Sequence, residues 1–403
     1  MKKSNILFVS IAFPPKNDPE CLQTSRYFKY LSKENFGITV VTSQSPLLYM
    51  PLDAGLMKYD SGYIQKIEVP VIESKLSNFV FRKLGLGSFL FPDSKMTFHW
   101  RWKEVVKKLK YRPDVIYSRS NPMSSAFMAL KLQKYYGCSW VMHLSDPWAL
   151  SPLHKPSQVN QLLKYESELL SHANAVTVTS AKTLQLYADK FPGLASKFFV
   201  LPNVYDPDDI REPVFSKSDK LTIVYTGGIT ANRNMQFLET VLERMYELDK
   251  KAADQIEFIF AGDVDRANRK FFKRESPIKH VGILSYQQVQ NLYQKAHLLM
   301  VVDNPTSAAG AVFFPSKLLD YFITRKKIVA ITPEDSTSRE VLRGYPHVAF
   351  THQEIDKMAR YFDEELNHFR QGNIMKFRAN SVPAQYDASM NVQKLVSLLK
   401  SLV

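Results

Sequence analysis

Short apolar runs rich in valine and isoleucine alternate with longer amphipathic stretches along the whole chain. Strands of a parallel sheet are buried on both faces and read as continuous apolar runs, whereas the covering helices repeat apolar residues every three or four positions. The pattern therefore predicts α/β layers built on parallel sheets. In the first half we expect strands at 5–10, 37–43, 114–118, 140–144, 175–180 and 198–202, with helices between them, for example at 24–32, 122–136 and 159–171.

A polar, proline-containing stretch at 203–220 interrupts this alternation, which then restarts. A chain of 403 residues exceeds the size at which one hydrophobic core keeps growing. The chain should thus form two Rossmann-like, doubly wound domains, whose ligands bind beyond the carboxyl ends of the strands, in a cleft between the domains. The predicted parts are a first domain at 1–204, a hinge at 205–220, a second domain at 221–385, and a helix at 386–403 that crosses back to the first domain. Strands of the second half are expected at 221–226, 256–262, 298–303 and 327–332, and helices at 235–248, 286–295 and 316–323.

The formal net charge of +14 calls for an anionic partner or simply favours solubility. The densest basic segment, Ser94 to Arg112, mixes tryptophan and phenylalanine with lysine and arginine, as interfacial helices do. A solvated helix whose aromatic side chains pack on the core has the same composition. An anionic membrane surface is the partner we expect, and nucleic acid is not expected because no recognised binding motif accompanies the charge.

The amino-terminal segment MKKSNILFVSIAFPP reads as a strand and not as a signal peptide, since its apolar run is short and broken by serine and proline. Two cysteines, Cys21 and Cys138, are too few for a disulfide framework. We therefore expect a cytoplasmic protein, peripheral on the inner face of the cytoplasmic membrane.

The strand LTIVYT runs directly into Gly227 and Gly228, followed by Arg233 and a helix expected to begin near Asn234. Glycines allow a ligand to approach the backbone closely, and a helix amino end with an arginine favours an anion. A tight strand-to-helix turn needs glycine in any case, so the motif alone leaves both interpretations open.

A second motif, FFPSKLLDYF, places Ser316 at a helix start and Lys317 in the first turn. The helix dipole disfavours a cation there unless an anion pairs with it. Asp320 lies three residues further on, on the same face. Lys317 and Asp320 form either a surface pair or, as we prefer, a site where Lys317 holds a diphosphate and Asp320 accepts hydrogen bonds from a ribose.

A third motif, WVMHLSDPW, puts His143 at the end of a buried strand and Asp146 in the following loop. Arg119 and Asn121 end the preceding strand and are expected on the same rim. A structural histidine and a turn aspartate before proline remain the alternative.

Aspartate pairs at 206/208 and 263/265 have a spacing that metal sites use, but they lie in the hinge and in a turn, so no metal is expected.

Taken in order, these features resemble glycosyltransferase family 4, in particular its bacterial surface-polysaccharide members. The matching pieces are ILFVSIAFPP, DVIYSRSNP, HLSDPW, ANAVTVTSAKTLQLYADKFP, LPNVYD, VYTGGI with Arg233, and PSKLLDYF. The sequence has no GxGxxG, GxxxxGK[ST], HExxH or CxxC, which weakens dehydrogenase, ATPase and zinc-hydrolase interpretations.

The resemblance implies the GT-B architecture and a metal-independent, retaining transfer of a sugar from a nucleotide-diphosphate sugar to a glycan or lipid-linked acceptor, with no further cofactor. It implies that the first domain binds the acceptor, that the second domain binds the nucleotide sugar, and that His143 lies beside the donor sugar. We expect His143 and Asp146, at the end of their strand, to be catalytic. Donor binding falls to Gly227, Gly228, Arg233, Ser316, Lys317 and Asp320, and acceptor binding to Arg26, Arg119 and Asn121.

The chain departs from the family pattern in two places. The glycine pair usually seen after the first strand is replaced by AFPPKNDPECLQTSR, and the paired glutamates spaced by seven residues are replaced by Val312 and Asp320. The second departure affects the contacts of the donor sugar more than those of the diphosphate. A nucleotide-sugar 2-epimerase of the same fold is the rival enzyme, and a basic nucleic-acid-binding protein is the rival of a different class.

Overall fold

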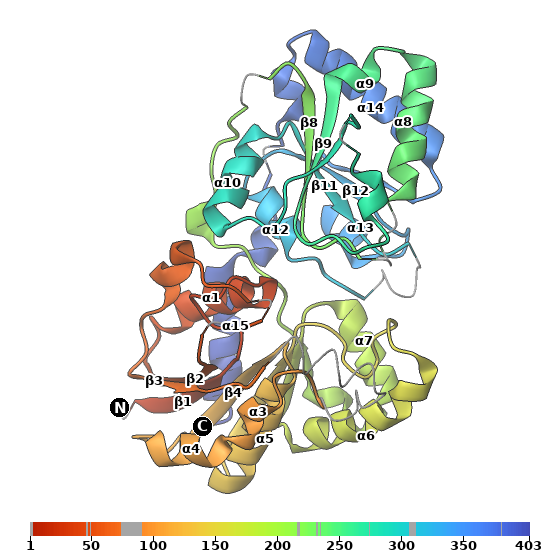
Figure 1. Ribbon diagram of the computed structural model, residues 1–403. Helices are drawn as coiled ribbons and strands as arrows, with labels where there is room; N and C mark the ends of the chain where they lie inside the picture. Colours follow the sequence, from red (N-terminus) through yellow and green to blue (C-terminus); the bar gives the residue numbers. More distant parts are fainter. Residues whose placement is uncertain are drawn as a thin grey trace. The chain divides into compact units, whose positions relative to one another are not determined.

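The computed structural model describes residues 3–403 except 46, 49, 74–90, 216–217, 231–232, 234, 274, 306–311 and 380. The chain divides into two compact units, Met1–Asp206 with Gln385–Val403, and Pro207–Ala384. Each unit is built on a parallel sheet covered by helices (Figure 1). Most of the predicted hinge is packed on the second unit, where Phe215 lies against the core and Glu212 pairs with Arg325 and Arg378.

The sheet of the first unit has, among the described residues, seven parallel strands in the order β3-β2-β1-β4-β5-β6-β7. The run NILFV shows why it is buried on both faces: Leu7 and Val9 join one apolar cluster, while Ile6 and Phe8 join another on the opposite face. The strands are β1 (Ser4–Val9), β2 (Phe36–Ser43), β3 (Gln65–Val69), β4 (Val115–Ser120), β5 (Ser139–Leu144), β6 (Ala175–Val178) and β7 (Phe198–Val200).

Helices cover both faces of this sheet. The cluster around Leu7 includes residues of α4, α5, α6 and α7, and the cluster around Phe8 includes residues of α1 and α15. The helices of this unit are α1 (Pro19–Leu31), α3 (Thr97–Trp100), α4 (Trp102–Lys108), α5 (Ser124–Tyr136), α6 (Pro156–His172), α7 (Ala181–Lys190) and α15 (Ala388–Lys400), with short 3-10 turns at η1 (Ala54–Tyr59) and η3 (Pro192–Lys197).

The sheet of the second unit has, over the described ranges, six parallel strands in the order β10-β9-β8-β11-β12-β13. They are β8 (Leu221–Thr226), β9 (Ile256–Ala261), β10 (Ile278–His280), β11 (Leu298–Val302), β12 (Lys327–Ile331) and β13 (Val348–Phe350). Helices α8 and α14 pack together over one face (Figure 1). The helices are α8 (Gln236–Leu248), α9 (Ala252–Gln255), α10 (Tyr286–Lys295), α12 (Lys317–Phe322), α13 (Thr337–Leu342) and α14 (Ile355–Arg370), with 3-10 turns at η4 (Pro207–Asp209), η5 (Arg269–Phe271), η6 (Ile374–Phe377) and η7 (Ala384–Tyr386).

The last helix, α15, belongs to the first unit although the chain reaches it from the second. It packs beside α1, and its Val392, Leu395 and Leu399 share an apolar cluster with Phe28 and Leu31. In Figure 1, α15 is the blue helix beside the red α1.

Three local predictions were wrong. Helix α1 begins at Pro19 and not at Thr24, because Asp18 caps it by accepting a hydrogen bond from the Glu20 amide and proline suits the first turn. The basic segment at 94–112 forms two short helices broken at Arg101 instead of one interfacial helix. The short strands β3, β10 and β13 were not predicted, because runs of three to five residues carry too little periodicity. Asn234, where the helix after Gly228 was expected to begin, lies outside the described residues.

Within the described ranges, no helix is long and apolar enough to cross a membrane.

The position of α15 gives a stability prediction. Replacing Leu395, which is 1% exposed, by alanine should lower the free energy of unfolding by about 2–5 kcal/mol, because a buried leucine loses its contacts and leaves a cavity. Met390 lies on the same helix but is 58% exposed, so Met390→Ala should stay within about 0.5 kcal/mol of wild type. Urea unfolding of both variants measures the difference, and equal effects would contradict the packing of α15.

Candidate functional site

The turn after β8 brings its backbone unusually close to the turn after β9. Gly227 has φ +124°, and its amide donates to the Ala261 carbonyl at 2.8 Å. Gly262 has φ +143°, and a Cβ there would lie 2.3 Å from the Gly227 carbonyl oxygen. Only glycine fits both conformations and this contact.

Lys317, the first residue of α12, lies directly over this turn. Its ammonium is 2.4 Å from the point where a Cβ of Gly227 would be, so the missing side chain of Gly227 makes room for the lysine. The same ammonium donates to the Tyr225 hydroxyl at 3.0 Å and lies 4.1 Å from the centre of the Tyr225 ring. Lys317 is therefore held at the Gly227–Gly228 turn, which brings two of the motifs singled out in the sequence together.

Arg233, which follows Gly227 and Gly228 in the chain, also bonds to this turn. Its Nη1 donates to the Gly228 carbonyl at 3.1 Å, and the Tyr225 hydroxyl donates to that carbonyl at 3.1 Å. Arg233 and Lys317 thus bond to the same small cluster, one through Gly228 and the other through Tyr225.

Asp303, which follows β11, is the carboxylate of this cluster. It is 6% exposed, and its Oδ2 accepts a hydrogen bond from Thr332 at 2.7 Å. Burial raises the pKa of Asp303, and hydrogen bonds together with the charges of Arg233 and Lys317 oppose that rise. The sequence analysis missed Asp303 and Tyr225. Asp303 fits the rule that selected His143, a polar residue directly after a buried strand, whereas nothing in the strand pattern distinguishes Tyr225 from a core residue.

The electrostatics of the cluster favour an anion. Burial lowers the pKa of Lys317, and the neighbouring Arg233 lowers it further. Burial raises the pKa of Tyr225, but the positive charges of Lys317 and Arg233 outweigh burial and bring it below its ordinary value. Arg233 and Lys317 bring two positive charges to this turn, and a diphosphate would pair with both.

The sheet order shows why these residues meet. From β8 the chain continues outward through β9 and β10 on one side and through β11 and β12 on the other, so β8 and β11 flank the switch point. Gly227, Gly228 and Arg233 follow β8, while Asp303 and Lys317 follow β11. Ligands of open α/β sheets bind at this place.

Ser316 and Asp320 lie before and after Lys317 along the chain. Ser316 precedes α12, but its side chain forms no capping hydrogen bond. Asp320 is 9% exposed, on the same short helix as Lys317. Their predicted contacts with the donor remain predictions.

Arg119 of β4 is wholly buried in the first unit. Its Nε donates to Glu20 Oε1 at 2.9 Å, its Nη1 donates to the Tyr117 hydroxyl at 3.2 Å, and its guanidinium lies 5.2 Å from the centre of the Tyr27 ring. Glu20 Oε2 also accepts a short hydrogen bond from the Ser145 hydroxyl. Burial lowers the pKa of Arg119, but Glu20 more than restores it, so Arg119 is charged. Its observed partners are structural, and the sequence did not reveal Glu20.

His143 lies beside Arg119 in the sheet register and is also fully buried. Its Nδ1 is 2.9 Å from Thr177 Oγ1, and its Nε2 has no hydrogen-bond partner among the described residues. Burial, with a smaller effect of the Arg119 charge, lowers the pKa of His143 well below 6.5. The imidazole is therefore neutral near pH 7.

The remaining predicted residues of the first unit differ in how exposed they are. Asp146 and Asn121 are exposed in the loops after β5 and β4, where a rim was expected. Arg26 is 2% exposed on α1 and donates to the Val204 carbonyl at 2.9 Å. This contact ties α1 to the end of the first unit and leaves little of Arg26 accessible to an acceptor.

The loop after β1, where the family has a glycine pair, holds a buried lysine. Lys16 is 1% exposed, and its ammonium makes long hydrogen bonds to Thr42 Oγ1 at 3.3 Å and the Phe13 carbonyl at 3.5 Å. Burial lowers the pKa of Lys16 to about 8.

The aspartate pairs have local structural partners. Asp206 accepts hydrogen bonds from Lys29 at 2.6 Å and Tyr30 at 2.8 Å, and Asp265 accepts from the amide of Asn268 at 3.0 Å. In the part of the chain that the structure describes, no group of three or more His, Cys, Asp and Glu side chains is placed to hold a metal ion.

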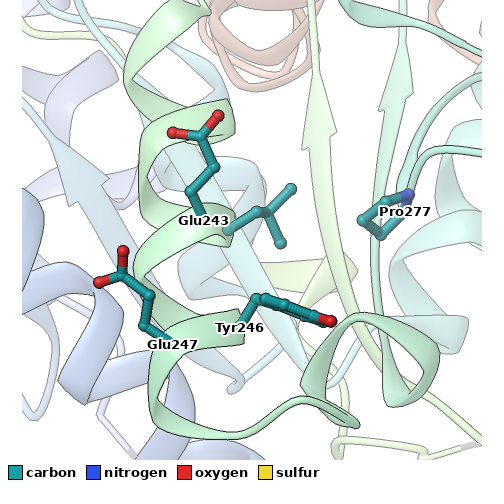
Figure 2. A pocket seen from close by; sticks show the side chains of 5 residues that line it. Glu243, Tyr246, Glu247 and Pro277 are labelled. Carbon is teal, nitrogen blue, oxygen red and sulfur yellow. The ribbon is translucent and has the colours of Figure 1, made fainter.

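Figure 2 shows a hollow of about 500 Å³ on the second unit, lined by Leu242, Glu243, Tyr246, Glu247 and Pro277. It lies against α8 and the residue before β10, toward the amino ends of the strands, and contains none of the predicted site residues. Its two glutamates would repel a phosphate, so this hollow is not the predicted donor site.

Three comparisons with known proteins bear on this geometry. The family model for the glycosyl transferase 4-like domain matches residues 60–204. No curated protein sequence matches the chain.

Several solved structures are similar over the whole chain. HepE of Anabaena, solved in complex with UDP and glucose, is 14% identical, with a TM-score of 0.66 over 99% of this chain and 100% of HepE. Sucrose-phosphate synthase of Thermosynechococcus elongatus is 12% identical, with a TM-score of 0.63 over 99% of each chain. The UDP-forming trehalose-phosphate synthase of Burkholderia xenovorans is 11% identical, with a TM-score of 0.62 over 99% of this chain and 100% of the synthase. At these identities the likeness shows the fold, and it confirms the predicted GT-B fold.

Burial of His143 generates a pH prediction. Its pKa lies below 6.5 in the folded protein and near 6.5 when unfolded, so in this range the unfolded state binds the extra proton. Stability should therefore fall as pH drops below 6.5, and His143→Gln should reduce this slope by up to about 1.4 kcal/mol per pH unit.

Urea unfolding between pH 5 and 7.5 measures the slope. Thr177→Val is the matched control, because it removes the partner of Nδ1 but keeps the imidazole, so it should lower stability without flattening the slope. An unchanged slope in His143→Gln would show that the imidazole is not a buried neutral group.

Proposed function

We propose that the protein is a glycosyltransferase that transfers a sugar from a nucleotide-diphosphate sugar to a glycan or lipid-linked acceptor, because the glycosyl transferase 4-like model matches residues 60–204 and the chain has the GT-B fold. We propose that the donor binds the second unit, with Arg233 and Lys317 at the diphosphate. The transfer proceeds with retention, without a metal ion and without a further cofactor.

One observation carries this proposal: Lys317 and Arg233 both bond at the Gly227–Gly228 turn, beside the switch point of the sheet. In a diphosphate-sugar transfer, negative charge develops on the leaving diphosphate, so fixed cations stabilise the transition state. HepE, which has the same fold, was solved with UDP and with UDP-glucose, so UDP is the first nucleotide to test.

His143 and Asp146 remain the proposed catalytic residues. A neutral, buried imidazole can accept or donate a hydrogen bond without an unpaired charge, and the unpartnered Nε2 is the atom available for that contact. Asp146, exposed in the next loop, is proposed to contact acceptor hydroxyls.

We further propose that the protein works at the cytoplasmic face of an anionic membrane. Phe98 and Val105 turn toward the core, whereas Trp100 is 56% exposed. Tyr135 of α5 is 57% exposed and lies 5.7 Å, ring centre to ring centre, from Trp102 of α4. These aromatic side chains adjoin exposed lysines at 103, 107, 108 and 110, a combination that suits the interface of an anionic bilayer.

The donor site is tested by nucleotide binding. Lys317→Ala or Arg233→Ala should weaken UDP binding by about 2 kcal/mol, roughly 30-fold, because a charge-assisted contact is lost. Lys295→Ala is the control, since this exposed lysine lies just before the amino end of β11, at the opposite edge of the sheet. Calorimetry that finds UDP bound equally by wild type and both site variants would refute the assignment.

The membrane proposal is tested by vesicle sedimentation. Replacing Lys103, Lys107 and Lys108 together by alanine should weaken binding to phosphatidylserine-containing vesicles by roughly 3 kcal/mol at low salt, about 1 kcal/mol for each lysine near the surface. Added salt should release the wild-type protein.

The matched control replaces the exposed Lys250, Lys251 and Lys376 of the second unit by alanine, with the same change of net charge. Equal losses in both triple variants would show that total charge, and not the aromatic surface, determines binding. Equal binding to neutral and anionic vesicles would refute an electrostatic contribution altogether.

A further inference from the structure

Tyr225, the penultimate residue of β8, is 1% exposed, and its hydroxyl serves two partners. It accepts a hydrogen bond from the Lys317 ammonium at 3.0 Å and donates one to the Gly228 carbonyl at 3.1 Å. A phenol has one proton to donate, and here that proton goes to the glycine turn while a lone pair receives the lysine.

The ring of Tyr225 has two neighbours of its own. The Lys317 ammonium lies 4.1 Å from its centre, within the range of a cation–π contact, and the ring packs 5.4 Å from that of Phe260 in the apolar core. Phenylalanine would keep both contacts. The hydroxyl is therefore not required to fill the core. Tyr225→Phe would remove the two hydrogen bonds of the hydroxyl and keep the packing of the ring, so this variant distinguishes a role at the site from a role in packing.

Lys317 needs such a partner because its surroundings otherwise disfavour a fixed ammonium. It is the first residue of α12, where the helix dipole opposes a cation, and the charge of Arg233 opposes it as well. Its flexible side chain would be free to turn toward water if nothing held it. The hydroxyl and ring of Tyr225, together with the space above Gly227, fix the ammonium at the turn.

We propose that Tyr225 is a positioning residue, whose hydroxyl and ring hold the Lys317 ammonium over the Gly227–Gly228 turn so that it meets the donor diphosphate. The inference rests on the proposed function, since a nucleotide diphosphate is the ligand that Lys317 meets. The Gly228 carbonyl accepts a hydrogen bond from this hydroxyl and another from Arg233.

This role predicts a change in the pH dependence of binding. Titratable and charged groups that act on Lys317 include Tyr225 on β8, which bonds to it, Arg233 in the following loop and Asp303 after β11. Burial and Arg233 lower the pKa of Lys317, while Tyr225 and Asp303 oppose them. Removing the hydroxyl lowers the pKa of Lys317 further, so the ammonium is lost, and UDP binding declines, at a lower pH than in wild type.

The test measures UDP binding to the full chain by calorimetry between pH 7 and 9.5. Tyr225→Phe should weaken binding about tenfold at pH 7.5, as expected for a lost hydrogen bond to a charged group, and its decline with pH should begin earlier than that of wild type. In a Lys317→Ala background, the same substitution should have little further effect, because the group it positions is gone.

Tyr321→Phe is the control for a structural role. Its buried hydroxyl accepts a hydrogen bond from the Thr226 amide at 3.0 Å, one residue after Tyr225, so this variant also loses a buried hydroxyl beside β8. It should lower the melting temperature but leave the pH dependence of UDP binding as in wild type.

The outcomes separate the two proposals. If Lys317→Ala weakens UDP binding but Tyr225→Phe binds like wild type at every pH, or weakens binding equally with and without Lys317, the positioning role is wrong and the donor site stands. If neither Lys317→Ala nor Arg233→Ala changes UDP binding, the donor assignment fails, and the inference about Tyr225 fails with it.

Discussion

The close contact between the Gly227 carbonyl and Gly262 is the constraint on which the cluster of Tyr225, Arg233, Asp303 and Lys317 depends. A side chain at Gly262 would meet backbone atoms, which cannot move without disturbing β8 and β9 together. A side chain at Gly227 would meet the end of Lys317, which is flexible. The two glycines are therefore required for different reasons. Gly262 holds two strands in register at their carboxyl ends, whereas Gly227 makes room for a functional group above the turn.

The first unit has a buried ion pair at β4 and β5. Arg119 is enclosed with Glu20, and a buried ion pair of this kind often adds little net stability because both charges lose their hydration. Breaking it by removing one partner is costly, since the other charge stays buried. Its evident consequence is geometric: Glu20 connects the start of α1, strand β4 and Ser145, and so fixes the loop that carries Asp146.

The sequence predicted the parts of the structure that depend on periodicity and on the ends of strands. Lys317, Gly227 and Arg233 lie together in the structure because each follows a strand at the switch point, where topology alone brings residues together. Tyr225 was missed because a tyrosine inside an apolar strand looks like a core residue, and only the three-dimensional contact with Lys317 distinguishes it.

Other residues could not be predicted for related reasons. Glu20 lies in a helix whose start was placed too late, so its carboxylate was not expected near Arg119. Arg26 was assigned to the acceptor by resemblance, yet its burial and its bond to Val204 depend on how the end of the first unit packs on α1. The basic segment at 94–112 gave no signal for its break at Arg101, because Phe98 and Val105 are seven residues apart and one continuous helix would also have turned both toward the core. Long-range packing decided the first two cases.

The charges of the two clusters support the proposal that the nucleotide binds the second unit. Around β4 and β5, Arg119 is matched by Glu20 and His143 is neutral, so these buried groups carry no net charge. At the turn after β8, the charges of Arg233 and Asp303 act on Lys317, and burial disfavours the charged forms of both Lys317 and Asp303. Buried positive charge is costly in the absence of an anion, and the cost is relieved when one binds. The second cluster therefore gains electrostatic energy from a diphosphate, whereas the first would have to bury an additional, uncompensated charge and is better matched to neutral hydroxyl groups.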